Sequence, residues 1–148
     1  MNIIVNVVVK QDNKILMVQE GEGKAKGKWN FPAGHLDEGE DIFAGAIREA
    51  KEETGFDVKL TGLINLQNVV FNDRHILMVM FAAEIVGGTL TIDGKEIMNV
   101  KFTDVAEIFK MTDNELRSAD ARKETIKRLI DEKVCSLDVM SNYNCKTR

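Results

Sequence analysis

The sequence predicts an α/β fold in which a mixed β-sheet is covered by helices on both faces. Strand-like runs rich in β-branched residues alternate with helix-like segments along the chain. Two of the helix-like segments carry apolar residues at helical spacing. The chain has 148 residues, about the length of one domain, and it contains no repeat or linker. We therefore expect a single domain over residues 1–148.

The N-terminal part should be mostly extended. Two strand-like runs, residues 3–9 and 14–19, are joined by a hairpin turn at residues 11–13. A loop rich in glycine and lysine follows at residues 21–28. Residues 29–32 should again be extended, because Pro32 disfavours helical backbone at the residue before it.

A helix is expected over residues 41–54, after a loop at residues 34–40. Asp41 is a candidate N-cap, and Gly55 is placed to end the helix. One face of this helix should pack against the sheet, because its apolar residues recur at helical spacing. These residues are Ile42, Phe43, Ala46, Ile47 and Ala50.

The second half should hold three strands and two helices. The strands are expected near residues 58–70, with a possible break at residues 61–62, and at residues 76–86 and 97–102. The helices are expected over residues 105–109 and from residue 114 to about residue 133.

Composition excludes several classes of protein. The net charge of −4 argues against general nucleic-acid binding, which needs a basic surface. The longest apolar run, residues 76–83, is too short to span a bilayer, and the N-terminus lacks the features of a signal peptide. The two cysteines, Cys135 and Cys145, suggest reduced thiols and a cytoplasmic protein.

The predicted helix 41–54 has an unusual concentration of acids near its end. Glu49, Glu52 and Glu53 share one face, where like charges repel, and they lie at the negative end of the helix dipole. A hard cation would resolve this conflict, because Mg²⁺ and Mn²⁺ prefer carboxylate oxygens. The alternative is a solvated charged face, with Arg48 paired to Glu52 and Lys51 screening its neighbours.

The residues before the helix favour the metal site. Gly34, five residues, Glu40 and seven residues lead to Arg48-Glu49-Ala50-Lys51-Glu52-Glu53-Thr54-Gly55-Phe56. This stretch resembles the Nudix box, G-x5-E-x7-R-E-U-x-E-E-x-G-U with U apolar, and every specified position matches. The resemblance extends over nearly the whole chain, with only the tail at residues 134–148 outside it. It implies an α/β/α sandwich with a mixed central sheet and a box at residues 34–56.

The resemblance also implies a metal-dependent chemistry. It gives the carbonyl of Gly34 and the carboxylates of Glu49, Glu52 and Glu53 as ligands of Mg²⁺ or Mn²⁺. Arg48 matches the arginine that orients a box glutamate. The expected reaction is hydrolysis of a phosphoanhydride bond in a nucleoside di- or triphosphate, or in a nucleoside-diphosphate-linked small molecule, by attack of water on phosphorus.

The general base is open between Glu49 and Glu96. Glu96 precedes a predicted strand, and its position resembles that of a downstream acid that several family members place beside the metals. The alternative for Glu96 is an exposed glutamate in a turn.

Four residues are candidates for substrate binding. Arg74 and Lys28 are candidates for phosphate contacts, and Trp29 or Phe71 is placed to stack on a base. The alternatives are a solubilising lysine loop for Lys28 and a core role for either aromatic ring. The segments at residues 32–36 and 114–118 resemble the branch that acts on nucleoside di- and triphosphates.

Two other functions stay open. One is a catalytically silent Nudix domain that binds a nucleotide and regulates another process. The other is a pyrophosphohydrolase of RNA 5′ ends, which the net charge disfavours because RNA needs a basic track. The expected partner is a small nucleotide-type molecule, with no membrane association, and the expected state is a monomer or a homodimer.

Overall fold

The N-terminal strand β1 (Asn2–Gln11) lies at the centre of the sheet. It runs parallel to β6 (Arg74–Gly88) along one edge and antiparallel to β4 (Ala33–His35) and β2 (Lys14–Glu20) along the other. A strand with neighbours on both edges and cover on both faces is apolar almost throughout. Accordingly, residues 7–9 of β1 are completely buried.

The computed structural model describes residues 2–143 and residue 145. The sheet follows the order β3-β2-β1-β6-β5, with β4 paired to β1 and β7 paired to β2. The mixed α/β architecture expected from the sequence is thus confirmed. The remaining elements are β3 (Trp29–Asn30), α1 (Ile42–Thr54), β5 (Phe56–Phe71), β7 (Ile97–Asp104), α2 (Val105–Lys110), α3 (Ala119–Ile130) and the 3₁₀ turn η1 (Leu137–Val139).

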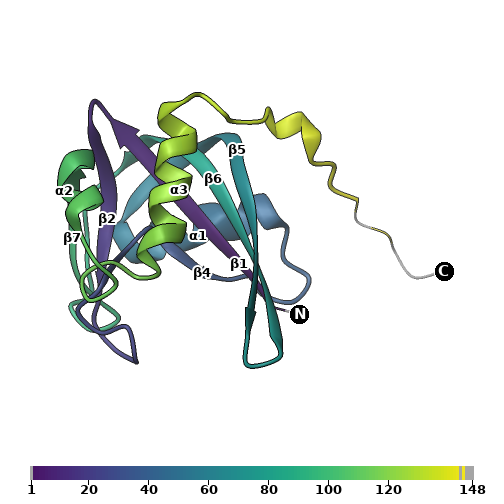
Figure 1. Ribbon diagram of the computed structural model, residues 1–148. Coiled ribbons are helices and arrows are strands. Elements are labelled where there is room, and N and C mark those ends of the chain that lie inside the picture. The colour runs from purple at the N-terminus through teal and green to yellow at the C-terminus, as the bar shows by residue number, and fades with distance from the viewer. Residues whose placement is uncertain (1, 144, 146–148) are drawn as a thin grey trace.

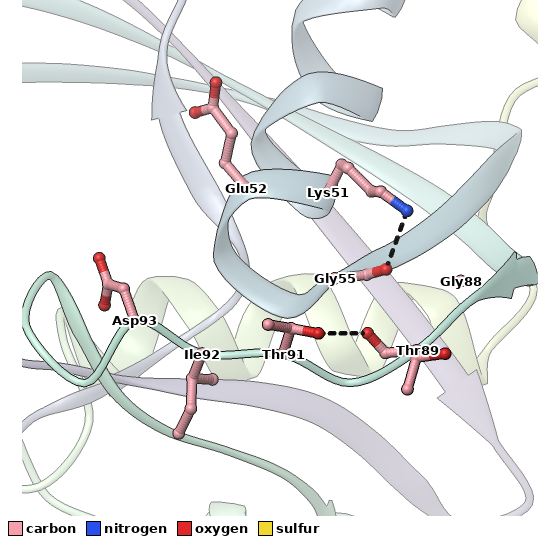
Figure 2. Close-up of a pocket in the computed structure, with 8 residues that line it drawn as sticks. All are labelled: Lys51, Glu52, Gly55, Gly88, Thr89, Thr91, Ile92 and Asp93. Carbon is pink, nitrogen blue, oxygen red and sulfur yellow. Dashed lines mark hydrogen bonds between the residues drawn. The ribbon is translucent and has the colours of Figure 1, made fainter.

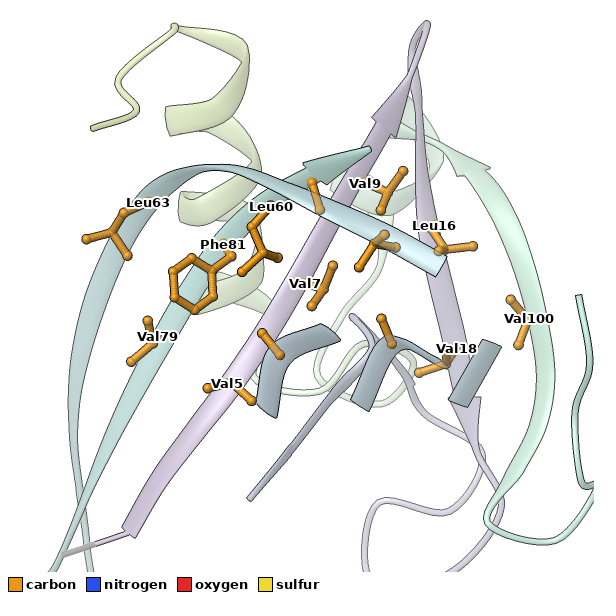
Figure 3. Packing of buried hydrophobic residues seen from close by; sticks show 14 of the residues in the cluster. Val5, Val7, Val9, Leu16, Val18, Leu60, Leu63, Val79, Phe81 and Val100 are labelled. Atoms are coloured by element: carbon orange, nitrogen blue, oxygen red, sulfur yellow. The ribbon is translucent and has the colours of Figure 1, made fainter. Parts of the chain in front are cut away.

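Helices cover both faces of the sheet, and each face has its own core. In Figure 1, α3 crosses in front of β1 and α1 lies behind the sheet. On the α1 face, Ala46 and Ala50 pack on a cluster that includes Val7 and Phe81, which Figure 3 shows from close by. On the α3 face, Ile126 packs in a second cluster with, among others, Val8, Met80 and Phe31. The alternation of side chains along β1 divides its residues between these two cores.

The ends of α1 follow the signals in the sequence. The carboxylate of Asp41 accepts hydrogen bonds from the backbone N–H groups of Phe43 and Ala44, at 2.7 and 3.1 Å, which satisfies two of the donors that a helix start leaves free. Gly55 ends the helix with φ +81°, a left-handed conformation that favours glycine. Ile47 differs from the expectation: it is 39% exposed, so the buried face is narrower than its apolar residues suggest.

Two expected boundaries in the first half are corrected. The predicted loop at residues 34–40 begins with strand β4, because residues 33–35 pair with residues 4–6 of β1. The predicted strand at residues 58–70 is one strand, β5, without a break. Its pairing with β6 instead shifts register between Leu60 and Gly62 and again between Leu63 and Asn65, so the glycine marks a bulge.

The C-terminal helix starts later than the sequence indicates, at Ala119 and not at residue 114. Trp29 donates its backbone N–H to the carbonyl of Glu115 at 2.8 Å, and Arg117 donates to the carbonyl of Trp29 at 2.9 Å. These bonds hold residues 115–117 against β3, with Leu116 in a single bridge to Trp29 between two turns. The backbone of this segment is therefore satisfied by a strand that is distant in sequence.

The tail that follows α3 is described to Tyr143 and at Cys145, so residues 144 and 146–148 of the predicted tail lie outside the described residues. Cys135 pairs with Leu63 of β5 through backbone hydrogen bonds at 2.8 and 2.9 Å. Asn142 donates to the N-cap carboxylate of Asp41 at 2.9 Å. None of the helices in the described part of the chain combines the length and apolar character needed to cross a membrane.

Candidate active site

A cleft of about 700 Å³ opens where α1, β4 and the start of α3 meet; we call it the main cleft. One part of its lining is acidic and contains Glu20, Glu53 and Glu96 beside Gly34. A second part is apolar and comes from the α3 face of the sheet: Ile4, Val69, Phe71, Ile76 and Met78. A third part is polar and includes Asn30, Gln67, Arg117 and Arg122.

Glu53 is held in the acidic part by a bond between two elements. It lies in the last turn of α1 and is 9% exposed. Its Oε1 accepts the backbone N–H of Ala33, in β4, at 2.8 Å. The other carboxylate oxygen has no protein donor among the described residues. A buried carboxylate with this geometry is poorly stabilised by protein donors alone.

The pKa values of the acidic part also indicate that its carboxylates are poorly stabilised. Burial is the main cause that raises the pKa of Glu53 to about 8; the N–H of Ala33 opposes this change, and the nearby charges of Glu49, Glu20 and Glu96 add to it. Burial also raises the pKa of Glu49, although the guanidinium of Arg48 opposes this change. The protein therefore places Glu53 near three other carboxylates that repel it, an arrangement that a cation would stabilise.

Gly34 faces the carboxylate of Glu49 directly. A Cβ added at Gly34 would collide with the carboxylate carbon and both oxygens of Glu49. Only glycine leaves room for the side chain of α1 to reach the backbone of β4 at this point. The backbone of Gly34 and a carboxylate of α1 are thus placed side by side.

Arg48 ties the acidic face of α1 to the loop before it. Its guanidinium donates to both oxygens of Glu40, to Glu49 at 2.9 Å and to Glu52 at 3.1 Å. It also donates to the backbone carbonyl of His35 at 3.2 Å, next to Gly34. Glu40 is the largest of the causes that raise the pKa of Arg48 above its usual range. Arg48 therefore fixes the orientation of the box carboxylates.

The donor set suits a hard divalent cation. The carbonyl of Gly34 and the carboxylates of Glu49, Glu52 and Glu53 are oxygen donors of the kind that Mg²⁺ and Mn²⁺ prefer. Across residues 2–143 and 145, no three Asp, Glu, His or Cys side chains converge closely enough to form a ligand cluster. Glu49 and Glu52 are instead turned toward Arg48. Two features fit a bound cation. The buried carboxylate of Glu53 lacks a compensating positive charge in the described part of the chain, and Gly34 lies against the carboxylate of Glu49.

Glu52 also borders a second hollow, of about 570 Å³, at the C-terminal end of α1. Figure 2 shows that Glu52 and Asp93 come from different segments on either side of it. Thr91 donates its backbone N–H to the carbonyl of Thr54 at 2.9 Å, and Lys51 donates to the carbonyl of Gly55 at 3.1 Å. The first bond fastens the segment after β6 to the end of α1, and the second is local to that end.

The loop before β7 brings Glu96 to the main cleft. Asp93 accepts the backbone N–H groups of Lys95 and Ile97, at 2.9 and 3.1 Å, which shapes the turn. Gly21 donates its backbone N–H to the carbonyl of Glu96 at 2.8 Å and so joins this turn to the end of β2. Glu96 thereby reaches the neighbourhood of Glu49 and Glu53, and its role as the base stays a prediction.

The four predicted substrate residues are not gathered in one place. Phe71 lines the main cleft and is 63% exposed. Lys28 lines a smaller adjoining hollow with Lys24 and Arg117. Trp29 is not among the residues that line the main cleft. It packs against the core of the α3 face, and the ammonium of Lys101 lies 4.7 Å from its ring centre. Arg74 lies at the tip of the β5–β6 hairpin, because the turn at residues 72–73 projects beyond the sheet.

Several polar residues of the cleft were not predicted from the sequence, among them Glu20, Asn30, Gln67 and Arg122. Glu20 directly follows a predicted strand, and Asn30 lies in a short strand whose pairing was not foreseen. Gln67 lies on the α3 face of β5. Arg122 had a detectable signal, since it lies four residues before Ile126 on the same face of the helix, where an apolar residue is expected.

Comparisons with known proteins agree with this geometry. The family model described as NUDIX domain matches residues 2–129. The chain is 28% identical over 111 residues to "ADP-ribose pyrophosphatase" of Methanocaldococcus jannaschii, which covers 74% of this chain and 65% of that protein. It is 36% identical over 102 residues to "NAD-capped RNA hydrolase NudC" of Vibrio atlanticus, which covers 69% of this chain and 37% of that protein.

A solved structure supports the fold over nearly the whole chain. The "NUDIX hydrolase from Nitrosomonas europaea" superposes with a TM-score of 0.82 at 29% identity, and the match covers 96% of this chain and 97% of that one. The chain spans less than two thirds of the length of both curated relatives.

Proposed function

The chain belongs to the NUDIX family, and we propose that it hydrolyses a phosphoanhydride bond in a nucleoside-diphosphate-linked small molecule or a nucleoside di- or triphosphate, with Mg²⁺ or Mn²⁺. The observation that carries this proposal is the acidic part of the main cleft, where the carboxylate of Glu53 lacks a compensating positive charge among the described residues. Glu53 is buried there with a raised pKa, and Glu49, Glu20 and Glu96 are close enough to repel it. Such an arrangement is costly unless a cation occupies it, and a bound cation would in turn attract an anionic substrate.

The box residues have distinct roles in this proposal. The carbonyl of Gly34 and the carboxylates of Glu49, Glu52 and Glu53 would hold the ion. Its positive charge would offset the negative charge of the phosphates, which otherwise repels the attacking oxygen. Arg48 is a positioning residue, because it contacts Glu49 and Glu52 and the backbone next to Gly34.

The proton of the attacking water is taken by a carboxylate of the cleft. Glu49 and Glu96 are the two candidates, as both lie near Glu53. A general base works best when its pKa is near the working pH. Burial raises the pKa of Glu49 in that direction.

The apolar part of the main cleft favours a substrate with a nucleoside. Phosphates alone need no apolar wall, whereas a base or sugar buries its faces against one. Ile76 and Met78 form part of this wall, and Phe71 at its edge is exposed and able to stack on a ring. The names of the two curated relatives, a pyrophosphatase of ADP-ribose and a hydrolase of NAD-capped RNA, support a nucleoside-diphosphate linkage.

The test is product analysis with a panel of substrates in Mg²⁺ and in Mn²⁺. The panel holds nucleoside di- and triphosphates, ADP-ribose, nucleoside-diphosphate sugars, dinucleoside polyphosphates and a 5′-triphosphorylated RNA. Wild type is compared with Glu49→Gln and with Glu107→Gln, a matched control on the exposed side of α2. Reaction in ¹⁸O-labelled water shows whether water attacks phosphorus, since the label then appears in a phosphate product.

We expect metal-dependent turnover of small nucleotides that is lost in Glu49→Gln and kept in Glu107→Gln. Turnover confined to RNA would favour the RNA 5′-end reaction. Tight nucleotide binding without any turnover would overturn the proposal in favour of a silent binding domain.

A further inference from the structure

Arg122 places an unusual charge in the wall of the main cleft. It is 3% exposed, its Nε donates to Oδ1 of Asn30 at 2.7 Å, and its guanidinium lies 5.8 Å from the ring centre of Phe31. In the described chain, no carboxylate lies within 4.0 Å of it, and neither terminal nitrogen makes a hydrogen bond. Burial, followed by repulsion from Arg117, lowers its pKa to about 10. A buried guanidinium is normally paired. Here the described residues supply no acceptor to its two terminal nitrogens.

Within the described structure, Gln67 has an acceptor without a donor, whereas Arg122 has donors without acceptors. Its Nε2 donates to the backbone carbonyl of Ala121 at 2.9 Å and to Oγ1 of Thr125 at 3.3 Å. A carbonyl can only accept, so this contact fixes which end of the amide is the nitrogen. The oxygen, Oε1, is buried, and no donor reaches it from residues 2–143 or 145. An unpartnered buried acceptor is uncommon in folded proteins, and this one belongs to a side chain that lines the cleft.

The strand register places Gln67 away from the acids. Gln67 is opposite Met78, Met78 is opposite Ile4, and Ile4 is opposite His35, which adjoins Gly34. Three strand spacings separate Gln67 from His35, about 14 Å along the same face of the sheet. A ligand whose phosphates lie at the box would therefore bring its far part, and not its phosphates, to Gln67.

We propose that Arg122 and Gln67 select the base of the nucleotide, and that they fit a base edge with two neighbouring acceptors followed by a donor. This inference rests on the proposed function and names the substrate class for the same cleft. The two terminal nitrogens of Arg122 donate to the acceptors, and Oε1 of Gln67, once its side chain turns to expose this buried atom to the cleft, accepts from the donor. One ligand would then supply both the acceptors for Arg122 and the donor for Gln67.

Among guanine, cytosine, adenine and uracil, only the first two have this edge. Guanine offers N7 and O6 to an arginine, and its N1–H follows. Cytosine offers O2 and N3, followed by its amino group. In adenine the amino group stands between the ring acceptors, and in uracil the N–H stands between the carbonyls, so each would set a donor against the arginine fork. A second anionic group would suit Arg122 but would place its oxygens against the unpartnered oxygen of Gln67.

The first experiment varies the ligand and leaves the protein unchanged. Binding of GMP, IMP, CMP, AMP and UMP is measured by calorimetry, together with 7-deaza-GMP, which lacks the N7 acceptor. GMP or CMP should bind roughly ten- to a hundredfold more tightly than AMP and UMP. If guanine is the base, 7-deaza-GMP should lose about tenfold, while IMP, which keeps N7, O6 and N1–H, should match GMP.

The second experiment varies the protein. Arg122→Lys keeps the charge but loses the fork, and Gln67→Met loses the acceptor with little change in length. Each should flatten the base preference, and Lys127→Gln, on the exposed side of α3, should leave it unchanged. Thermal unfolding is measured in parallel. A purely structural role would lower the melting temperature and keep the ratio of GMP to AMP affinity.

The outcomes separate this inference from the proposed function. Hydrolysis of nucleotides without base preference, or with a preference for adenine, would overturn the base assignment and leave the proposed function standing. Selective binding of GMP or CMP without hydrolysis would do the reverse. Pyrophosphate that binds as tightly as the best nucleotide would show that Arg122 holds an anion and would overturn the inference.

Discussion

The carboxylate of Glu40 accepts two hydrogen bonds from the guanidinium of Arg48, at 2.7 Å from Nε and 2.9 Å from Nη2. The same carboxylate accepts the backbone N–H of Asp37 at 3.0 Å. One side chain thus joins the loop before α1 to the arginine that orients Glu49 and Glu52. Bidentate pairs of this kind fix geometry as well as adding energy.

Stability in acid should depend on Glu40. The guanidinium of Arg48, followed by the N–H of Asp37, lowers the pKa of Glu40 to about 2 from its usual 4.5. A lowered pKa in the folded state means that the pair contributes its full stability above pH 4.5 and loses it as the pH falls toward about 2. In urea unfolding followed across this range, Glu40→Gln should show a smaller loss than wild type. Equal losses in both proteins would contradict the assignment.

Replacement of Gly34 by alanine should reduce activity far more than stability. The new Cβ would occupy the space of the Glu49 carboxylate, so that side chain must move from the backbone of β4. Displacement of a catalytic group by about 1 Å typically costs on the order of a hundredfold in rate. Steady-state kinetics and thermal unfolding test this, with Glu107→Gln, on the exposed side of α2, as control.

Gly45 lies inside α1, where alanine would ordinarily stabilise a helix by about 1 kcal/mol. Here a Cβ would lie 2.5 Å from Cδ1 of Leu36 and 2.9 Å from Oε1 of Glu40. We expect Gly45→Ala to lower the free energy of unfolding by about 1–3 kcal/mol, the usual cost of overpacking. Chemical denaturation measures the sign directly, and a stabilised variant would show that the loop before α1 is free to shift.

Glu53→Gln should separate stability from activity. Glutamine keeps an oxygen for the N–H of Ala33 and removes the buried charge. Burial raises the pKa of Glu53 to about 8, so the metal-free wild type should lose stability as the pH rises from 4.5 to about 8. The variant should lack this loss and be more stable near pH 9 by a few kcal/mol. Metal-dependent turnover should disappear, and calorimetry should show weaker binding of Mn²⁺. A variant that is less stable than wild type under these conditions would show that the charge of Glu53 is already compensated.

The sequence by itself determined the local elements and the identity of the box. Asp41 and Gly55 set the ends of α1 because capping depends on side chains and backbone angles close by in the chain. The strands β1 and β2 were predicted from runs of β-branched residues, because strand propensity also depends on residues close together in the chain. The spacing of Glu49, Glu52 and Glu53 on one helix gave the acidic face, since helical geometry is fixed over a few residues.

Only the tertiary structure decided what faces that helix. The pairing of β4 with β1 sets Gly34 against Glu49, and the bond between Gly21 and Glu96 carries a distant acid to the same cleft. Strand pairing with Trp29 delays the start of α3, and the fold places Arg122 and Gln67, which are 55 positions apart, in one wall. Arg74, placed near the substrate from sequence, instead lies at a hairpin tip. These relationships depend on contacts between residues far apart in the chain, which local propensity and spacing do not encode.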